Sequence, residues 1–162
     1  MTGDGDAILA ARVAALEAAF GQIERTRMVG LPLLNARLAV ETVGFERESP
    51  KARVALGVLI TPWFMSLLRL PLCEAAAAEL PAVGIKQVRD CGTRQFEFIG
   101  AQETGIGRYE ASALFSPMFE FADLAAARAT ASAVLTLLRQ VERPAACPVP
   151  ARRGFLFGRP AA

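Results

Sequence analysis

Tyr109 and Glu110 are adjacent in the stretch RYEASALF, and an acid–base catalyst could use this pair of side chains. The phenol and the carboxylate would then act as acid and base, and a strongly raised pKa of Glu110 would favour such an enzyme. Two other acids, Glu97 and Glu103, could pair with Glu110 across strands. We expect all three acids on the solvated face of a half-exposed sheet, where charged side chains are usually found.

The other polar residues offer little to a catalyst. The chain has no histidine, which removes His-assisted nucleophiles, imidazole metal ligands and the usual general base near neutral pH. Ser116, which precedes Pro117, therefore lacks a histidine to activate it. Three cysteines, Cys73, Cys91 and Cys147, are widely spaced and form no CxxC pair. We expect free thiols, no zinc or iron–sulfur site and no cofactor.

Trp63 is the single tryptophan and lies in the apolar run VLITPWFMSLL, residues 58–68. Thr61-Pro62 before it either caps a helix that begins at the proline or ends the preceding strand. Because Pro62 ends or redirects that strand, we expect Trp63 at the rim of the sheet. There its ring can be largely buried while its N–H reaches water or a partner. A fully buried Trp63 is the alternative.

The C-terminal segment, residues 148–162, joins a Pro-rich stretch to a short apolar one. Its apolar side chains either form an edge strand or clasp on the domain's own surface, or belong to a flexible arm that holds a partner. In the second case Arg152 and Arg153 could meet acidic groups of that partner. The segment contains Arg152, Arg153, Phe155, Leu156, Phe157 and Arg159.

Length and composition favour one globular domain. The 162 residues are 53% hydrophobic, with 18 Lys and Arg against 16 Asp and Glu, so the charge gives no sign of a nucleic-acid-binding face. The longest apolar stretches fall well short of the roughly 20 residues that span a bilayer. The N-terminal MTGDGDAILA carries acids before its first apolar residues, unlike a secretory signal peptide. We therefore expect a soluble, cytoplasmic protein.

Hydrophobic periodicity predicts the elements that position these residues. Residues 7–27 form an amphipathic helix with Asp6 as its N-cap, and residues 123–141 form a second one with Asp123 as its N-cap. Residues 38–60 fit two strands joined by a turn, residues 74–82 a short helix, and residues 85–117 further strands.

The order helix, strands, helix, tail predicts an α+β fold. We expect an antiparallel β-sheet with the N-terminal and C-terminal helices packed on one face. Residues 1–147 form this domain, and residues 148–162 form the Pro/Arg-rich tail.

Three stretches of the sequence resemble signature stretches of the HybE family of nickel–iron hydrogenase accessory proteins, which includes the HupJ and HoxT types. They are VLITPWFMSLLRLP, RYEASALFSPMFEFAD and RRGFLFGR, and the spacing between them also matches. Some relatives carry a rubredoxin domain or work beside a separate rubredoxin. This chain lacks the paired cysteines of a rubredoxin, so we expect such a function from another protein.

The resemblance implies a non-catalytic maturation chaperone that binds immature hydrogenase subunits in the cytoplasm. The clients it implies are small-subunit precursors with twin-arginine signal peptides, large-subunit precursors, or both. A rubredoxin-like accessory protein is a further partner, whereas nucleic acid and a membrane span are not expected. On this hypothesis the client-binding residues are Thr61, Pro62, Trp63, Tyr109, Ser116, Pro117, Arg152, Arg153, Phe155, Phe157 and Arg159.

Two other classes of function stay open. An antiparallel sheet under helices often leaves an apolar pocket, so a small-molecule-binding domain is one alternative. A metabolite that stays bound through purification would favour it. An enzyme that uses Glu110 and Tyr109 is the other. Co-purification with hydrogenase precursors would favour the chaperone over both.

Overall fold

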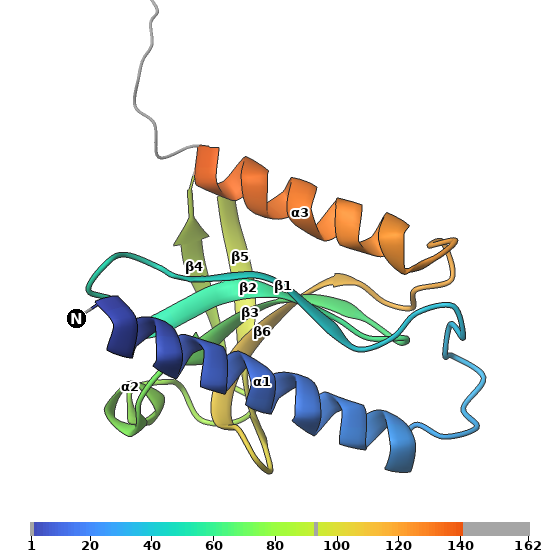
Figure 1. Cartoon of the computed structure of the whole chain (residues 1–162), viewed down its shortest axis with the longest axis horizontal. Coiled ribbons are helices and arrows are strands. Elements are labelled where there is room, and N and C mark those ends of the chain that lie inside the picture. The colour runs from blue at the N-terminus through green and yellow to red at the C-terminus, as the bar shows by residue number, and fades with distance from the viewer. Residues whose placement is uncertain (1, 93, 141–162) are drawn as a thin grey trace, which may run out of the picture.

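One antiparallel sheet carries the fold, and a long helix stands at either end of the described chain (Figure 1). The computed structural model describes residues 2–92 and 94–140. Within them the elements are α1 (Thr2–Thr26), β1 (Glu41–Arg47), β2 (Val54–Ile60), β3 (Met65–Pro71), α2 (Glu74–Ala78), β4 (Lys86–Cys91), β5 (Arg94–Glu103), β6 (Gly107–Phe115) and α3 (Leu124–Gln140). The strand order is β1-β2-β3-β6-β5-β4, with every neighbouring pair antiparallel. The predicted α+β class is confirmed.

The apolar run of residues 58–68 is a β-hairpin. Strand β2 ends at Ile60 and strand β3 begins at Met65, so Pro62 follows a strand and does not start a helix. Strand β3 pairs with β2 on one side and β6 on the other. Most of its residues are buried, and a continuous apolar run of this kind hides the period of two that marks a strand. Sequence reasoning therefore missed β3.

The two long helices cover opposite faces of the sheet, which corrects the expectation that both would pack on one face (Figure 1). Helix α3 packs on the face that carries Val58, and helix α1 packs on the face that carries Leu59. Successive side chains of a strand point to opposite faces, so these neighbours belong to two separate cores. We call the two sides the α3 face and the α1 face.

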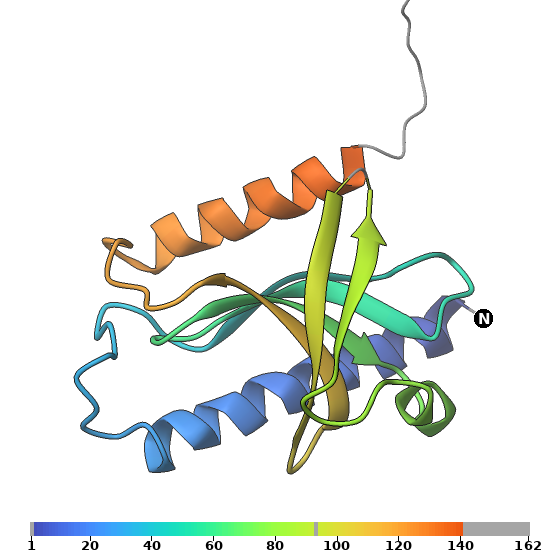
Figure 2. The ribbon, with the colours of Figure 1, turned by 180° about the vertical axis from the view of Figure 1, so that it is seen from behind.

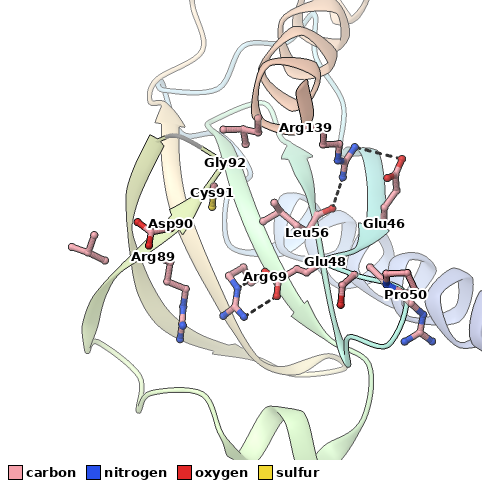
Figure 3. A pocket seen from close by; sticks show the side chains of 14 residues that line it. Glu46, Glu48, Pro50, Leu56, Arg69, Arg89, Asp90, Cys91, Gly92 and Arg139 are labelled. Carbon is pink, nitrogen blue, oxygen red and sulfur yellow. Dashed lines mark hydrogen bonds and ion pairs between the residues drawn. The ribbon is translucent and has the colours of Figure 1, made fainter. Parts of the chain in front are cut away.

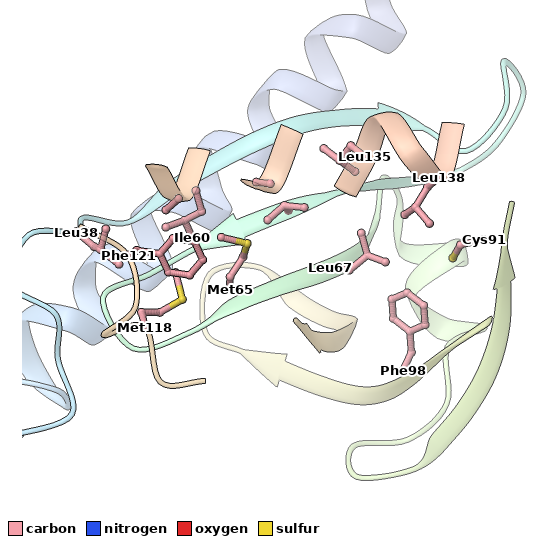
Figure 4. Close-up of a cluster of buried hydrophobic side chains, with 13 residues drawn as sticks. Leu38, Ile60, Met65, Leu67, Cys91, Phe98, Met118, Phe121, Leu135 and Leu138 are labelled. Carbon is pink, nitrogen blue, oxygen red and sulfur yellow. The ribbon is translucent and has the colours of Figure 1, made fainter. Parts of the chain in front are cut away.

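The core on the α3 face joins the apolar side of α3 to the middle of the sheet (Figure 4). Ala127 and Ala131 are fully buried there, and their small side chains allow the helix to lie close to the strands. The core on the α1 face is built mainly from Leu16 and Phe20 of the helix against Leu59, Leu68 and Leu70 of the sheet. Strands β2 and β3 are apolar on both sides because each side has its own helix.

Both predicted long helices are confirmed, with shifted ends. Asp123 accepts a hydrogen bond from the N–H of Ala126 at 2.8 Å, which confirms it as the N-cap of α3. Helix α1 begins at Thr2, so Asp6 lies inside the helix and the predicted cap is wrong. In the part of the chain described, no helix is long and apolar enough to cross a membrane.

Candidate functional site

The turn between β2 and β3 is built on the side chain of Thr61. Its hydroxyl oxygen accepts hydrogen bonds from the N–H of Trp63 at 3.2 Å and of Phe64 at 2.9 Å. The backbone N–H of Thr61 donates to the carbonyl of Phe64 at 2.8 Å. A threonine followed by a proline suits this position, because the hydroxyl replaces a backbone acceptor and Pro62 has no N–H that would need an acceptor.

Asn35 joins this turn to the loop that follows β6. Its backbone N–H donates to the carbonyl of Pro62 at 2.8 Å. Its side-chain amide donates to the carbonyls of Met118 and Phe121, both at 2.9 Å. Thr61-Pro62 and Ser116-Pro117, which sequence analysis assigned to one surface, therefore lie on segments that Asn35 connects. Sequence reasoning missed Asn35, although it is the only amide in the apolar loop LPLLNARLAV.

Exposed apolar side chains surround this connection. Phe119 is 56% exposed, and Leu31 and Leu33 of the α1–β1 loop are 39% and 40% exposed. Ser116 and Pro117 are exposed as well. We call these five residues the loop surface. Its backbone is held by Asn35, so the apolar groups are presented to the solvent on an ordered support.

Trp63 and Tyr109 lie in one row of aromatic rings beneath α1. Edge-to-face contacts connect Trp63 to Phe64 at 5.8 Å, Phe64 to Phe20 at 5.9 Å and Phe20 to Tyr109 at 6.3 Å between ring centroids. Trp63 is only 9% exposed and Tyr109 6%. The two residues therefore belong to the core of the α1 face, and Trp63 sits where that core meets the β2–β3 turn.

Glu110 lies on the opposite face of β6 from Tyr109. Tyr109 packs in the core of the α1 face, whereas the carboxylate of Glu110 is bound by Arg69 and Arg89 on the α3 face. The two side chains do not converge on one pocket, so the geometry gives no support to an enzyme that uses them together. The side chain of Glu110 is 0% exposed, and the expectation of a solvated position is wrong.

Four charged side chains form a network around Glu110 at one end of the α3 face. Arg69 donates to Glu110, and Arg89 donates to it through Nε at 2.7 Å and Nη2 at 3.0 Å. Arg69 also donates to both carboxylate oxygens of Glu48, at 2.7 and 3.1 Å. Burial by itself lowers the pKa of Arg69, but the hydrogen bonds and charges of Glu48 and Glu110 outweigh it and raise that pKa. The guanidinium stays charged.

Glu48, Arg69 and Arg89 of this network line a cleft of about 880 Å³ at the C-terminal end of α3 (Figure 3). Arg139 of the helix, Glu46 and Glu48 of the β1–β2 segment and Cys91 of β4 complete its wall. Burial, together with the charge of Glu48, raises the pKa of the Cys91 thiol, so its reactive thiolate form is disfavoured.

The cleft is a polar surface whose charges already satisfy one another. Among the residues described, every buried side-chain nitrogen or oxygen has a hydrogen-bond partner, and no group of three or more His, Cys, Asp or Glu residues could hold a metal ion. The carboxylate of Glu110 accepts three hydrogen bonds, all from arginine donors, and is fully buried. The lining side chains that a ligand could still reach include Arg89 and Arg139, which are 29% and 32% exposed.

Tyr109 is expected to ionise far above the usual pH for a phenol. Burial, aided by the charge of Glu103, raises the pKa of Tyr109 from 10.0 to about 12. Because the folded pKa exceeds the unfolded one, the stabilising effect is complete below pH 10 and is lost as the pH rises from 10 towards 12. Tyr109 is the single tyrosine, so tyrosinate absorbance reports it alone. A midpoint near pH 10 in the folded protein would show that the hydroxyl is solvated.

The tail residues Arg152, Arg153, Phe155, Phe157 and Arg159 lie outside the described residues. The structure therefore leaves both alternatives for the tail as predictions.

Three curated proteins are similar in sequence to this chain. Protein HoxT of Cupriavidus necator is 49% identical over 160 residues, which cover 91% of this chain and 89% of that protein. The hydrogenase expression/formation protein HoxT of Azotobacter vinelandii is 40% identical over 145 residues and 90% of each chain. The probable rubredoxin HupJ of Rhodobacter capsulatus is 35% identical over 83% of this chain but only 47% of its own length.

A family model and a solved structure agree with these relatives. The model described as NiFe-hydrogenase assembly, chaperone, HybE matches residues 11–158. The solution structure of HybE from Escherichia coli superposes with a TM-score of 0.58 at 22% identity, over 93% of this chain and 91% of that one. That structure has the same fold.

Proposed function

The chain belongs to the HybE family of NiFe-hydrogenase assembly chaperones, and on that premise we propose that it binds immature hydrogenase subunits before they are assembled. The membership confirms the family predicted from three sequence stretches. The match of the family model over residues 11–158 is the observation that carries the proposal. The clients are small-subunit precursors with twin-arginine signal peptides, large-subunit precursors, or both. We place this binding in the cytoplasm and assign the chain no catalytic step.

The loop surface is the client-binding site that we propose. Ser116, Pro117 and Phe119 would contact the client directly, because their side chains are exposed. Thr61, Pro62, Trp63 and Tyr109 are buried, so we assign them to the support of this surface from below. Exposed apolar groups on a fixed backbone suit a chaperone, which must recognise clients whose own apolar surfaces are not yet covered.

A rubredoxin-like protein is a further partner that we propose. The relative named probable rubredoxin HupJ is about twice as long as the segment that matches this chain. This chain has no CxxC pair, so a rubredoxin iron site would have to come from a separate protein.

Phe119→Ser should weaken capture of the client without weakening the fold. The ring is 56% exposed, and surface substitutions usually change stability by only about 0.5 kcal/mol. Leu137→Ser is the matched control, because Leu137 is 46% exposed on α3, away from the loop surface. Tagged wild-type and variant chains are co-expressed with small-subunit and with large-subunit precursors, and the captured precursor is quantified. We expect about a tenfold loss of affinity for Phe119→Ser and little loss for Leu137→Ser.

Two results of this experiment would contradict the proposals. If the wild-type chain captures neither precursor, the proposed function is wrong. If it captures one and both variants bind equally well, the function stands but the loop surface is not the client-binding site.

Deletion of residues 148–162 should leave a cooperative thermal transition and weaken client binding. We propose that Arg152, Arg153, Phe155, Phe157 and Arg159 contact the client, because this segment follows the helix–sheet–helix body in sequence. Thermal melting and precursor capture by the truncated chain measure the two effects separately. Loss of the folded state on truncation would instead show that the tail is part of the domain's own core.

A further inference from the structure

The two edge strands of the sheet, β1 and β4, differ in whether other parts of the chain bond to their outward-facing backbone groups. At the β1 edge, the carboxylate of Glu17 accepts hydrogen bonds from the N–H and the hydroxyl of Thr42, at 3.0 and 2.6 Å. Arg139 donates to the carbonyl of Gly44 at 2.9 Å, next to a bulge that interrupts the strand. Side chains from α1 and α3 thus occupy the peptide groups with which another strand would pair.

The β4 edge has no such cover in the part of the chain that the structure describes. No described side chain bonds to the backbone of residues 86–91, and β4 pairs only with β5. The N–H of Gly100 donates to the carbonyl of Ile85. In the register of β4 and β5, residues 85, 87, 89 and 91 therefore direct their peptide groups towards β5. Since antiparallel pairs alternate, the peptide groups of Lys86, Val88 and Asp90 face outward. Figure 2 shows β4 and β5 crossing the front of the molecule with no helix over them.

Exposed aliphatic side chains flank this open edge. Val88 is 59% and Ile99 39% exposed, and both lie on the α1 face of the β4–β5 hairpin. Val83 and Ile85, 57% and 53% exposed, precede β4. Their loop is held against Gly100, where a Cβ would lie 2.4 Å from the carbonyl oxygen of Ala82.

The other face of the hairpin is basic. Arg89 lies on the α3 face beside the cleft, and Arg94, which pairs with Cys91, lies on the same side. The α3 face of the hairpin carries Gln87, Arg89, Cys91, Arg94, Phe96 and Phe98, and none of these is acidic. The opposite face presents Val88 and Ile99 together with the charged Lys86, Asp90 and Glu97. On the α3 face Arg89 pairs with Glu110 of β6, and Arg94 adds a second positive charge.

We propose that the β4 edge binds an extended segment of the client as a seventh strand of the sheet. The inference rests on the proposed function and adds the mode of recognition. Main-chain hydrogen bonds to Lys86, Val88 and Asp90 hold the segment. Its successive side chains contact the α1 face and the α3 face of the hairpin in turn. Complementarity of charge defines the occupant: a segment with apolar side chains beside Val88 and acidic ones beside Arg89 and Arg94.

Hydrogen exchange on the isotope-labelled full-length chain tests the inference directly. When the precursor that the wild-type chain captures is bound, we expect the amides of Lys86, Val88 and Asp90 to exchange at about one tenth of their rate in the free chain or more slowly. The amide of Thr42 serves as the internal control, because Glu17 already occupies it.

Paired substitutions separate the main-chain bonds from the side chains. Val88→Pro removes one outward N–H, and proline is tolerated at such positions of an edge strand. We expect it to weaken capture about tenfold, while Val88→Ala keeps the N–H and weakens capture less. Lys86→Pro and Lys86→Ala repeat the comparison at the first residue of the strand, should Val88→Pro not fold. Arg94→Glu should weaken capture more than Arg94→Gln.

Three outcomes of these experiments would overturn the inference. If the precursor binds while the β4 amides exchange as in the free chain, the edge proposal is wrong and the proposed function stands. If the β4 amides are already slow in the free chain and become fast on deletion of residues 148–162, the chain's own tail occupies the edge. If no precursor binds the wild-type chain, the proposed function is wrong as well.

Discussion

Replacing Trp63 by alanine is expected to lower the free energy of unfolding by about 3–5 kcal/mol. The ring is 9% exposed and packs in the core of the α1 face. Its removal leaves a cavity beside Phe64, whose ring it contacts edge to face at 5.8 Å. Urea denaturation followed by circular dichroism measures the loss, because the variant has no tryptophan to follow by fluorescence.

Precursor capture by the folded fraction of Trp63→Ala then shows whether Trp63 supports the loop surface or contacts the client directly. We expect the folded fraction to bind almost as well as wild type, because Trp63 supports the loop surface from below. Trp63→Phe keeps an aromatic ring and should lose less stability than the alanine variant. A loss below about 1 kcal/mol together with strongly weakened capture would make Trp63 a contact residue, as its expected place at the rim of the sheet suggested.

Replacing Glu110 by alanine is expected to cost about 3–5 kcal/mol, since removal of one partner leaves buried charge uncompensated. Arg69 and Arg89 both donate to this carboxylate, and their side chains are 12% and 29% exposed. Arg69 would keep Glu48, but Arg89 would lose its only ion-pair partner among the described residues. Urea denaturation can be followed by the fluorescence of Trp63, the single tryptophan, which lies on the other face of the sheet.

Glu103→Ala is the matched control for this loss. Glu103 pairs with Arg27 at 2.7 Å, but the arginine side chain is 60% exposed, so we expect a change of about 0–1 kcal/mol. Should Glu110→Ala not fold, Glu110→Gln keeps the shape and removes only the charge. Equal, small losses for Glu110 and Glu103 variants would mean that water screens the network and that the cleft is not a buried charge site.

The sequence alone predicted the elements whose signals are local. Helices α1 and α3 follow from apolar residues at spacings of three and four, and Asp123 marked the start of α3 because an N-cap acts within one turn. Strands β1 and β2 and the short helix α2 were placed for similar reasons. The family was also predicted from sequence, because its signature stretches are contiguous.

The structure alone decided which face each element covers. Strands β2 and β3 are apolar on both sides, so their pattern could neither reveal the turn at residues 61–64 nor assign the two helices to one face or to two. Opposite faces result because adjacent residues such as Val58 and Leu59 each need a core. One-sided alternation would have specified the face, and this chain lacks it in the centre of the sheet.

The charged network depended most on tertiary structure. Glu48, Arg69, Arg89 and Glu110 come from four separate segments, and Glu110 was expected in solvent because neither of the arginines that bind it lies near it in sequence. Its neighbours on the same face, Ser112 and Leu114, were the one local sign of burial. The sheet order places β3 beside β6 and β4 two strands away from it, and only that arrangement brings two guanidinium groups to one carboxylate. A sequence pattern encodes the period of an element, whereas a buried charge is stabilised by partners that only the fold brings near.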